Sequence, residues 1–138
     1  MQHQPLKINT CFIQAAAFIG LLSIILGAFG AHGIKGRVTT EAFEIFETGV
    51  RYQMYHVFAL LAVGILWAFS PRPNCLKWAG YLFIAGILLF SGSLYLLTYA
   101  MGTANPDLFK YGVITPIGGF CFIAAWILLI VSFIRKKA

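Results

Sequence analysis

The sequence has little charge and very few acids. Only 10% of its 138 residues are charged, and just four of them are Asp or Glu. The apolar residues make up 60% of the chain and the mean hydropathy is +0.85, so a soluble fold would lack the polar surface to cover them. The three cysteines are too few and too widely spaced to form a disulfide or zinc framework. Phosphate-binding glycine loops and nucleophile motifs are absent as well, and we therefore expect neither a cofactor nor an enzyme.

Long apolar runs dominate what remains. Four of them are each about as long as the ~20 residues that a helix needs to cross a bilayer, and they cover residues 11–31, 52–69, 76–99 and 112–133. Pro71, Pro73 and Pro106 lie in the two short links that follow the second and third runs. Short links place consecutive helices side by side and antiparallel. The sequence predicts one all-α domain over residues 1–138, an integral membrane four-helix bundle.

The first run could also be read as a cleaved signal peptide, although it is longer than the usual ~7 to 15 apolar residues of such a segment. Between the first two runs, residues 39–50 show a helical pattern. Phe43, Phe46 and Val50 share one face, and Glu44 and Arg51 lie roughly opposite. We expect an amphipathic helix there that lies along the membrane interface and then turns into the membrane near Gly49.

The distribution of basic residues predicts the orientation. With a cytoplasmic N-terminus, the inner side holds six Lys and Arg residues and the outer side four, and all four acids lie outside. The six inner residues are Lys7, Arg72, Lys77, Arg135, Lys136 and Lys137. We therefore expect both termini in the cytoplasm, with residues 135–137 near anionic lipid headgroups. Because the basic residues follow the membrane topology and form no patch, nucleic-acid binding is not expected.

Three stretches of the sequence carry a family resemblance. They are Leu-Gly-Ala-Phe-Gly-Ala-His-Gly at 26–33, Tyr-Gln-Met-Tyr-His at 52–56, and Phe-Ser-Gly-Ser-Leu-Tyr-Leu-Leu at 90–97 followed by Ile-Thr-Pro-Ile-Gly-Gly at 114–119. On these stretches the chain resembles the YgdD-like family, a domain of unknown function (number 423) with a eukaryotic branch. The resemblance implies a four-helix protein of the bacterial inner (plasma) membrane and no established activity.

Small residues recur at spacings that suit helix packing. In lipid, helices associate through close van der Waals contact, which small side chains permit. The residues that we assign to helix packing are Gly20, Ser23, Gly27, Ala31, Gly118 and Gly119. Packing within the bundle is the favoured interpretation, and a homo-oligomer or another membrane protein as partner stays open.

Polar side chains gather in the predicted outer half of the membrane. A polar group inside a membrane is costly and often functional, but helix ends near headgroups are also normally polar. The candidates for a ligand site or polar cluster are His32, Glu47, Arg51, Tyr52, Gln53, Tyr55, His56, Ser91, Tyr95, Thr98 and Thr115. A metal shared by His32, His56 and Glu47 is a weak hypothesis, because no metal-binding spacing occurs on one helix.

These observations favour an accessory membrane protein that binds lipid, an apolar ligand or a membrane partner. The alternative is a small transporter or channel component that uses the polar cluster around His56. A membrane-embedded metal or redox enzyme is the third hypothesis, and it has the least support.

Overall fold

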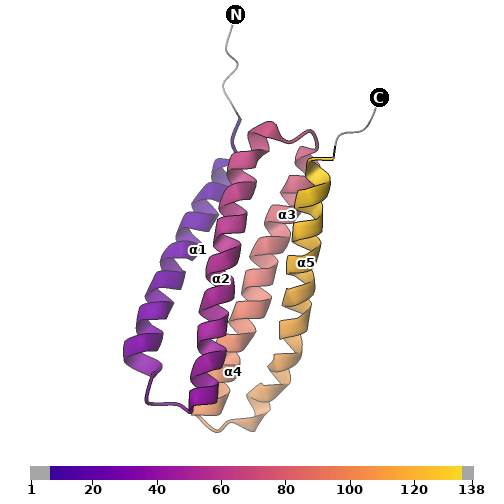
Figure 1. Ribbon diagram of the computed structural model, residues 1–138. Coiled ribbons are helices and arrows are strands. Elements are labelled where there is room, and N and C mark those ends of the chain that lie inside the picture. The colour runs from indigo at the N-terminus through magenta and orange to yellow at the C-terminus, as the bar shows by residue number, and fades with distance from the viewer. Residues whose placement is uncertain (1–6, 135–138) are drawn as a thin grey trace, which may run out of the picture.

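A computed structural model describes residues 7–134 of the chain, and within this range the ordered elements are all helical (Figure 1). Four segments are long and apolar enough to cross a membrane, so the predicted all-α four-helix membrane bundle is confirmed for the described residues. The helices are α1 (Thr10–Phe29), α2 (Thr40–Leu66), α3 (Pro73–Gly86), α4 (Gly92–Gly102) and α5 (Ile114–Ser132). The predicted headgroup contacts of Arg135, Lys136 and Lys137 lie outside the described residues.

Short irregular turns extend or join the helices. One π-helical turn, η1 (Gly30–Ile34), prolongs α1, and another, η3 (Ile87–Ser91), joins α3 to α4 as one continuous span. The 3-10 turns η2 (Trp67–Phe69) and η4 (Pro106–Val113) end the second span and begin the fourth. Side chains cap α1 and α2, since Asn9 accepts from the Phe12 amide at 3.3 Å and Thr39 from the Ala42 amide at 3.2 Å.

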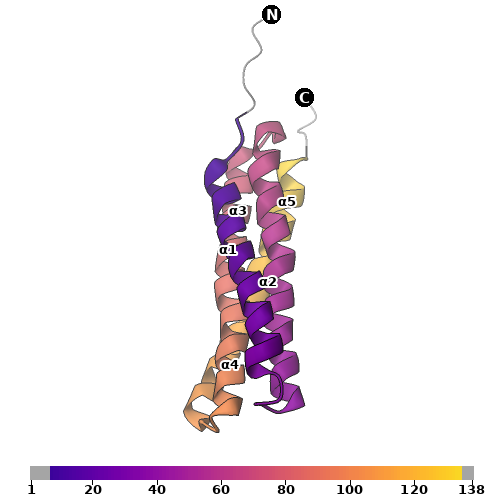
Figure 2. The same ribbon diagram turned by 90° about the vertical axis from the view of Figure 1, so that its left-hand side faces the viewer.

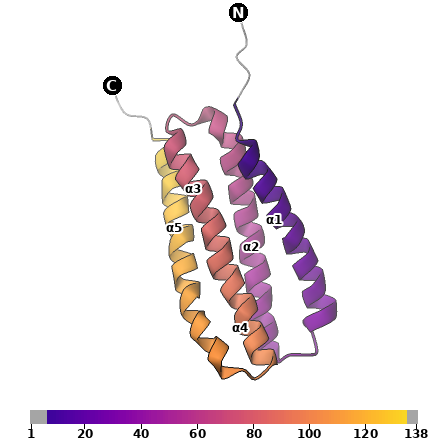
Figure 3. The same ribbon diagram turned by 180° about the vertical axis from the view of Figure 1, so that it is seen from behind.

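The second and third spans form the centre of the bundle. α1 packs mainly on α2, and α5 packs mainly on α3, so α1 and α5 lie on the two flanks (Figure 1). The start of α1 and the end of α5 lie at the same end of the bundle, as four antiparallel crossings require (Figure 3). We call this end the terminal end and the opposite end the distal end.

The amphipathic segment 39–50 does not form a helix of its own. It is the first part of α2, which continues without a break from Thr40 to Leu66. The predicted turn near Gly49 is therefore wrong. The physical reason is that Gly49 serves a close contact and not a bend. A Cβ atom at Gly49 would lie 2.7 Å from the Tyr95 ring, and the neighbouring Phe46 and Ala42 are buried.

α1 is in close contact with α3 near the terminal end and lies apart from α4 near the distal end. Near the termini the Phe12 ring of α1 lies against Gly80 of α3, where an added Cβ would be 2.5 Å from the ring. Toward the distal end α1 crosses over α2 and leaves α4 (Figure 2), but it stays against α2, because an added Cβ at Gly30 would lie 2.6 Å from the Phe46 ring. The separation of the end of α1 from α4 creates the candidate site.

Candidate functional site

A chain of hydrogen bonds crosses the bundle where α1 begins to leave α4. The Tyr95 hydroxyl of α4 donates to Oε1 of Gln53 at 2.8 Å, and Nε2 of Gln53 donates to the carbonyl oxygen of Ile19 at 3.2 Å. Gln53 is buried in α2, so its amide links α4 to α1 across the central helix. Buried amides need such partners, and the link fixes the inner wall of the site.

His56 lies deeper than this link and is covered by aromatic rings. Its ring stacks on Phe122 of α5 with centroids 3.4 Å apart and an angle of 5° between the planes. Nδ1 of His56 is 2.7 Å from the carbonyl oxygen of Tyr52, one turn earlier in α2. The structure therefore does not bring His56 into the same space as Tyr95.

Of the three hydroxyl candidates outside the tyrosines, Thr98 and Thr115 are hydrogen-bonded and Ser91 is not. Thr98 donates to the carbonyl oxygens of Ala42 at 3.2 Å and Leu94 at 3.0 Å. Thr115 and Ser93 share a bond of 2.7 Å that joins α5 to α4. The Ser91 hydroxyl is buried and has no hydrogen-bond partner among the described residues.

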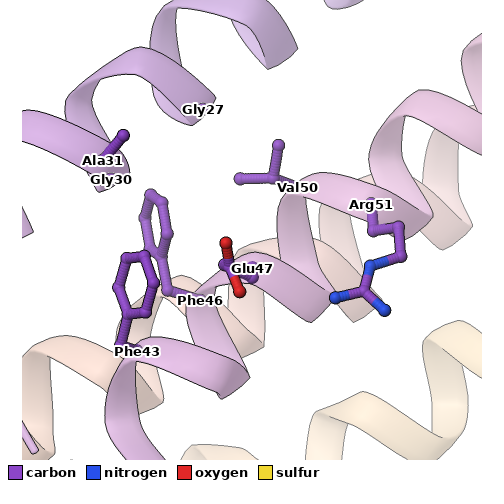
Figure 4. Close-up of a pocket in the computed structure, with 8 residues that line it drawn as sticks. All are labelled: Gly27, Gly30, Ala31, Phe43, Phe46, Glu47, Val50 and Arg51. Atoms are coloured by element: carbon purple, nitrogen blue, oxygen red, sulfur yellow. The ribbon is translucent and has the colours of Figure 1, made fainter. Parts of the chain in front are cut away.

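The remaining polar candidates are exposed, and of these the Tyr52 ring stacks on His56 with centroids 6.1 Å apart. These are His32 in η1 and Glu47, Arg51, Tyr52 and Tyr55 in α2. Glu47 and Arg51 border a shallow pocket of about 270 Å³ between α1 and α2 (Figure 4). The Phe43 and Phe46 rings there point toward the end of α1 (Figure 4).

A larger groove of about 660 Å³ opens on the distal side between the end of α1 and α4. Phe46 belongs to its wall, and the only charged lining residue is Arg37, which is exposed. The full lining is Leu26, Phe29, Ile34, Arg37, Val38, Phe46, Tyr95, Thr98, Tyr99, Gly102 and Thr103. An apolar groove with one cation suits an amphipathic molecule with an acyl chain and an anionic group.

Sequence reasoning found Tyr95 and Thr98 but missed most of this groove. In the sequence, Leu26 and Phe29 look like any other apolar residues that face lipid. Their role in the groove depends on the separation of α1 from α4, which the sequence does not show. Arg37 carried a usable signal, since it is a cation close to the end of an apolar span.

The small residues assigned to packing fall into two groups. Gly20 and Gly27 face Val57 and Val50 of α2, and the buried Ser23 donates to the carbonyl oxygen of Ile19 at 2.9 Å. A Cβ atom at Gly118 would collide with the backbone of Phe90. The other two are more open, because Ala31 is exposed and an added Cβ at Gly119 would meet nothing within 4 Å.

The hypothesis of a metal site gains no geometric support. Within residues 7–134, no three His, Cys, Asp or Glu side chains lie close enough together to hold a metal ion. The set of His32, His56 and Glu47 is thus not assembled as three ligands.

Four apolar spans and a polar link buried among them define this chain as a multi-span helical membrane protein. The chain belongs to the family described as "Protein of unknown function (DUF423)", whose model matches residues 26–119. This finding confirms the resemblance drawn from the sequence stretches. The family description names no activity.

Similar proteins are called membrane proteins. The UPF0382 membrane protein YwdK of Bacillus subtilis is 40% identical over 90% of this chain and 96% of its own length. The UPF0382 membrane protein SH2409 of Staphylococcus haemolyticus is also 40% identical, over 88% of this chain and 93% of its own length. No solved structure matches the chain.

Proposed function

We propose that this protein is an accessory membrane protein that binds a phospholipid in the groove between the end of α1 and α4. The observation that carries the proposal is the groove itself, which is about 660 Å³ in volume and lined mostly by apolar and aromatic side chains. An acyl chain fits such a lining, and burial of each CH₂ group contributes about 0.8 kcal/mol.

Arg37 gives the groove a polarity. Its guanidinium lies in the connection between η1 and α2, whereas Leu26 belongs to α1 farther from the distal end. A guanidinium binds phosphate oxygens through paired hydrogen bonds. We therefore assign the phosphate of an anionic phospholipid to Arg37 and one acyl chain to the stretch between Leu26 and Tyr95.

We propose that the terminal end faces the cytoplasm. The support is the charge distribution, since Lys7, Arg72 and Lys77 belong to this end and all four acids of the chain belong to the distal end. In this orientation the groove opens into the outer leaflet.

We do not propose a transport function, because packed side chains lie across any path through the bundle. A path through the membrane would have to continue from Tyr95 toward the terminal end, where the ring of His56 is stacked on Phe122. Farther along, Leu60, Val63 and Phe83 are fully buried and apolar.

Photocrosslinking tests the proposal. The full chain is placed in vesicles that contain a phosphatidylglycerol with a diazirine in one acyl chain, and the adducts are mapped by peptide mass spectrometry. We expect adducts concentrated on Phe29 and Tyr99, well above those on Phe120 of α5, although Phe120 is the more exposed side chain. Uniform labelling of all exposed apolar residues would contradict a groove.

A matched pair of variants separates the groove from the general lipid surface. Leu26→Trp fills the groove, and Leu22→Trp adds the same volume one turn earlier on α1, outside the lining residues. Leu26→Trp should lower the adducts on Tyr99 about tenfold, the equivalent of roughly 1.4 kcal/mol of binding. Leu22→Trp should leave them unchanged, and Phe120 should be labelled equally in both variants because the fold is preserved.

A further inference from the structure

A second groove lies at the terminal end of the bundle, where α1 begins and where η2 is followed by α3. Its volume is about 390 Å³, and it is formed by the start of α1, by η2 and by α3. The side chains that form it include Asn9, Phe12, Trp67, Lys77, Tyr81 and Ile84. The groove is separate from the distal groove, with which it shares no residue.

Aromatic rings build one wall of this groove in a fixed arrangement. The Phe12 ring meets Tyr81 edge-on with centroids 5.5 Å apart, and its centroid is 6.1 Å from that of Trp67. Phe12 is held in place because it fits against Gly80. Trp and Tyr side chains favour the boundary between headgroups and acyl chains, so this wall matches that depth in the membrane.

The groove is amphipathic along its length. Lys77 is exposed, and Ile84 lies seven residues farther along α3, about 10 Å deeper into the apolar span. One end therefore offers an ammonium group and the other an apolar surface. This is the order of groups in a phospholipid, whose phosphate precedes its acyl chains.

The charge of the terminal end selects the headgroup. The described ionic side chains near this end are Lys7, Arg72 and Lys77, whereas Glu41, Glu44, Glu47 and Asp107 belong to the distal end. Among residues 7–134, no Asp or Glu therefore lies at the terminal end to compete for the ammonium group of Lys77. An anionic headgroup in the groove is therefore attracted to the ammonium group of Lys77, the charged side chain of its lining.

We infer that the terminal groove is a specific binding site for one anionic phospholipid of the adjoining leaflet. The ammonium group of Lys77 binds the phosphate, Tyr81 and Trp67 pack on the glycerol region, and an acyl chain follows α3 toward Ile84. This inference does not depend on the distal groove, because the two sites lie at opposite ends of α1.

Native mass spectrometry tests the inference on the full chain released from vesicles of phosphatidylcholine with a minor share of phosphatidylglycerol. The measured quantity is the ratio of the two lipids retained by the protein. Lys77→Gln removes the charge within the groove. Arg72→Gln removes one at the same end but outside the lining residues, and Lys110→Gln removes one at the distal end.

Wild type and Arg37→Gln, which removes the cation of the distal groove, should both retain phosphatidylglycerol in preference to phosphatidylcholine. Adding Lys77→Gln to Arg37→Gln should lower the ratio about fivefold, the equivalent of roughly 1 kcal/mol. Arg72→Gln and Lys110→Gln should stay close to wild type. Absence of a preference in wild type or in Arg37→Gln, or an unchanged ratio when Lys77→Gln is added to Arg37→Gln, would overturn the site. An equal loss in Arg72→Gln would also overturn it, because the attraction would then belong to the whole surface.

Discussion

The two ends of α1 face the same central helices and yet pack differently. At the terminal end Phe12 fits against Gly80, and the backbone amide of Asn9 donates to the carbonyl oxygen of Gly64 at 2.9 Å. At the distal end Leu26 and Phe29 face a groove instead of a packed neighbour. The comparison shows how strongly close packing depends on what the facing helix offers.

The facing residues explain the difference. α3 offers a glycine to α1 at position 80, whereas α4 offers Tyr95, Thr98 and Tyr99 along the groove. Helices in lipid approach each other when one of them is small at the contact. Bulky side chains on α4 keep α1 away, and the space that remains is the groove.

The strongest test of this rule lies in the closely packed contact between α5 and η3. Gly118→Ala should destabilise the protein by about 3 kcal/mol, because the new Cβ atom collides with the backbone of Phe90 and not with a movable side-chain end. Unfolding in mixed detergent micelles measures the loss. Gly119→Ala is the control, since an added Cβ there meets nothing within 4 Å and its stability should change little. Similar stabilities for the two variants would refute the rule.

A smaller loss of stability is expected where α1 is in close contact with α3. Gly80→Ala should lower the free energy of unfolding by about 2 kcal/mol, because the new Cβ atom forces the Phe12 ring away from α3. The same unfolding assay applies, and Gly92→Ala in the same span is the control, as its added Cβ meets no atom within 4 Å. If Gly80→Ala is as stable as Gly92→Ala, the contact between Phe12 and Gly80 does not hold α1 against α3.

The smallest effect is expected at the border of the open groove. Tyr95→Phe removes the donor to Gln53 and should cost about 1 kcal/mol, since one hydrogen bond is lost and the Oε1 atom of Gln53 stays buried. Tyr99→Phe removes the same hydroxyl from a side chain that is 61% exposed and should be neutral. A loss in Tyr95→Phe equal to that in Gly118→Ala would show that polar bonds, and not close packing, dominate this bundle.

The four spans could be predicted because length and hydropathy are local properties of the sequence. The polar candidates could be identified as residue types but not as partners. Gln53 and Tyr95 are 42 residues apart and meet through helix register, whereas His56 faces Phe122, which nothing in the sequence singled out. Residues 39–50 were recognised as helical, but the role of Gly49 as a contact with Tyr95 appears only in the packed bundle.

The sequence by itself determined that the chain is a membrane protein of four helices, because apolar runs of this length have no stable place in water. It also determined where the charges lie along the chain. The tertiary structure alone decided where α1 is in close contact with α3 and where it lies apart from α4. That choice depends on whether a glycine or a bulky side chain of another helix faces α1, and such contacts join residues that are distant in the chain.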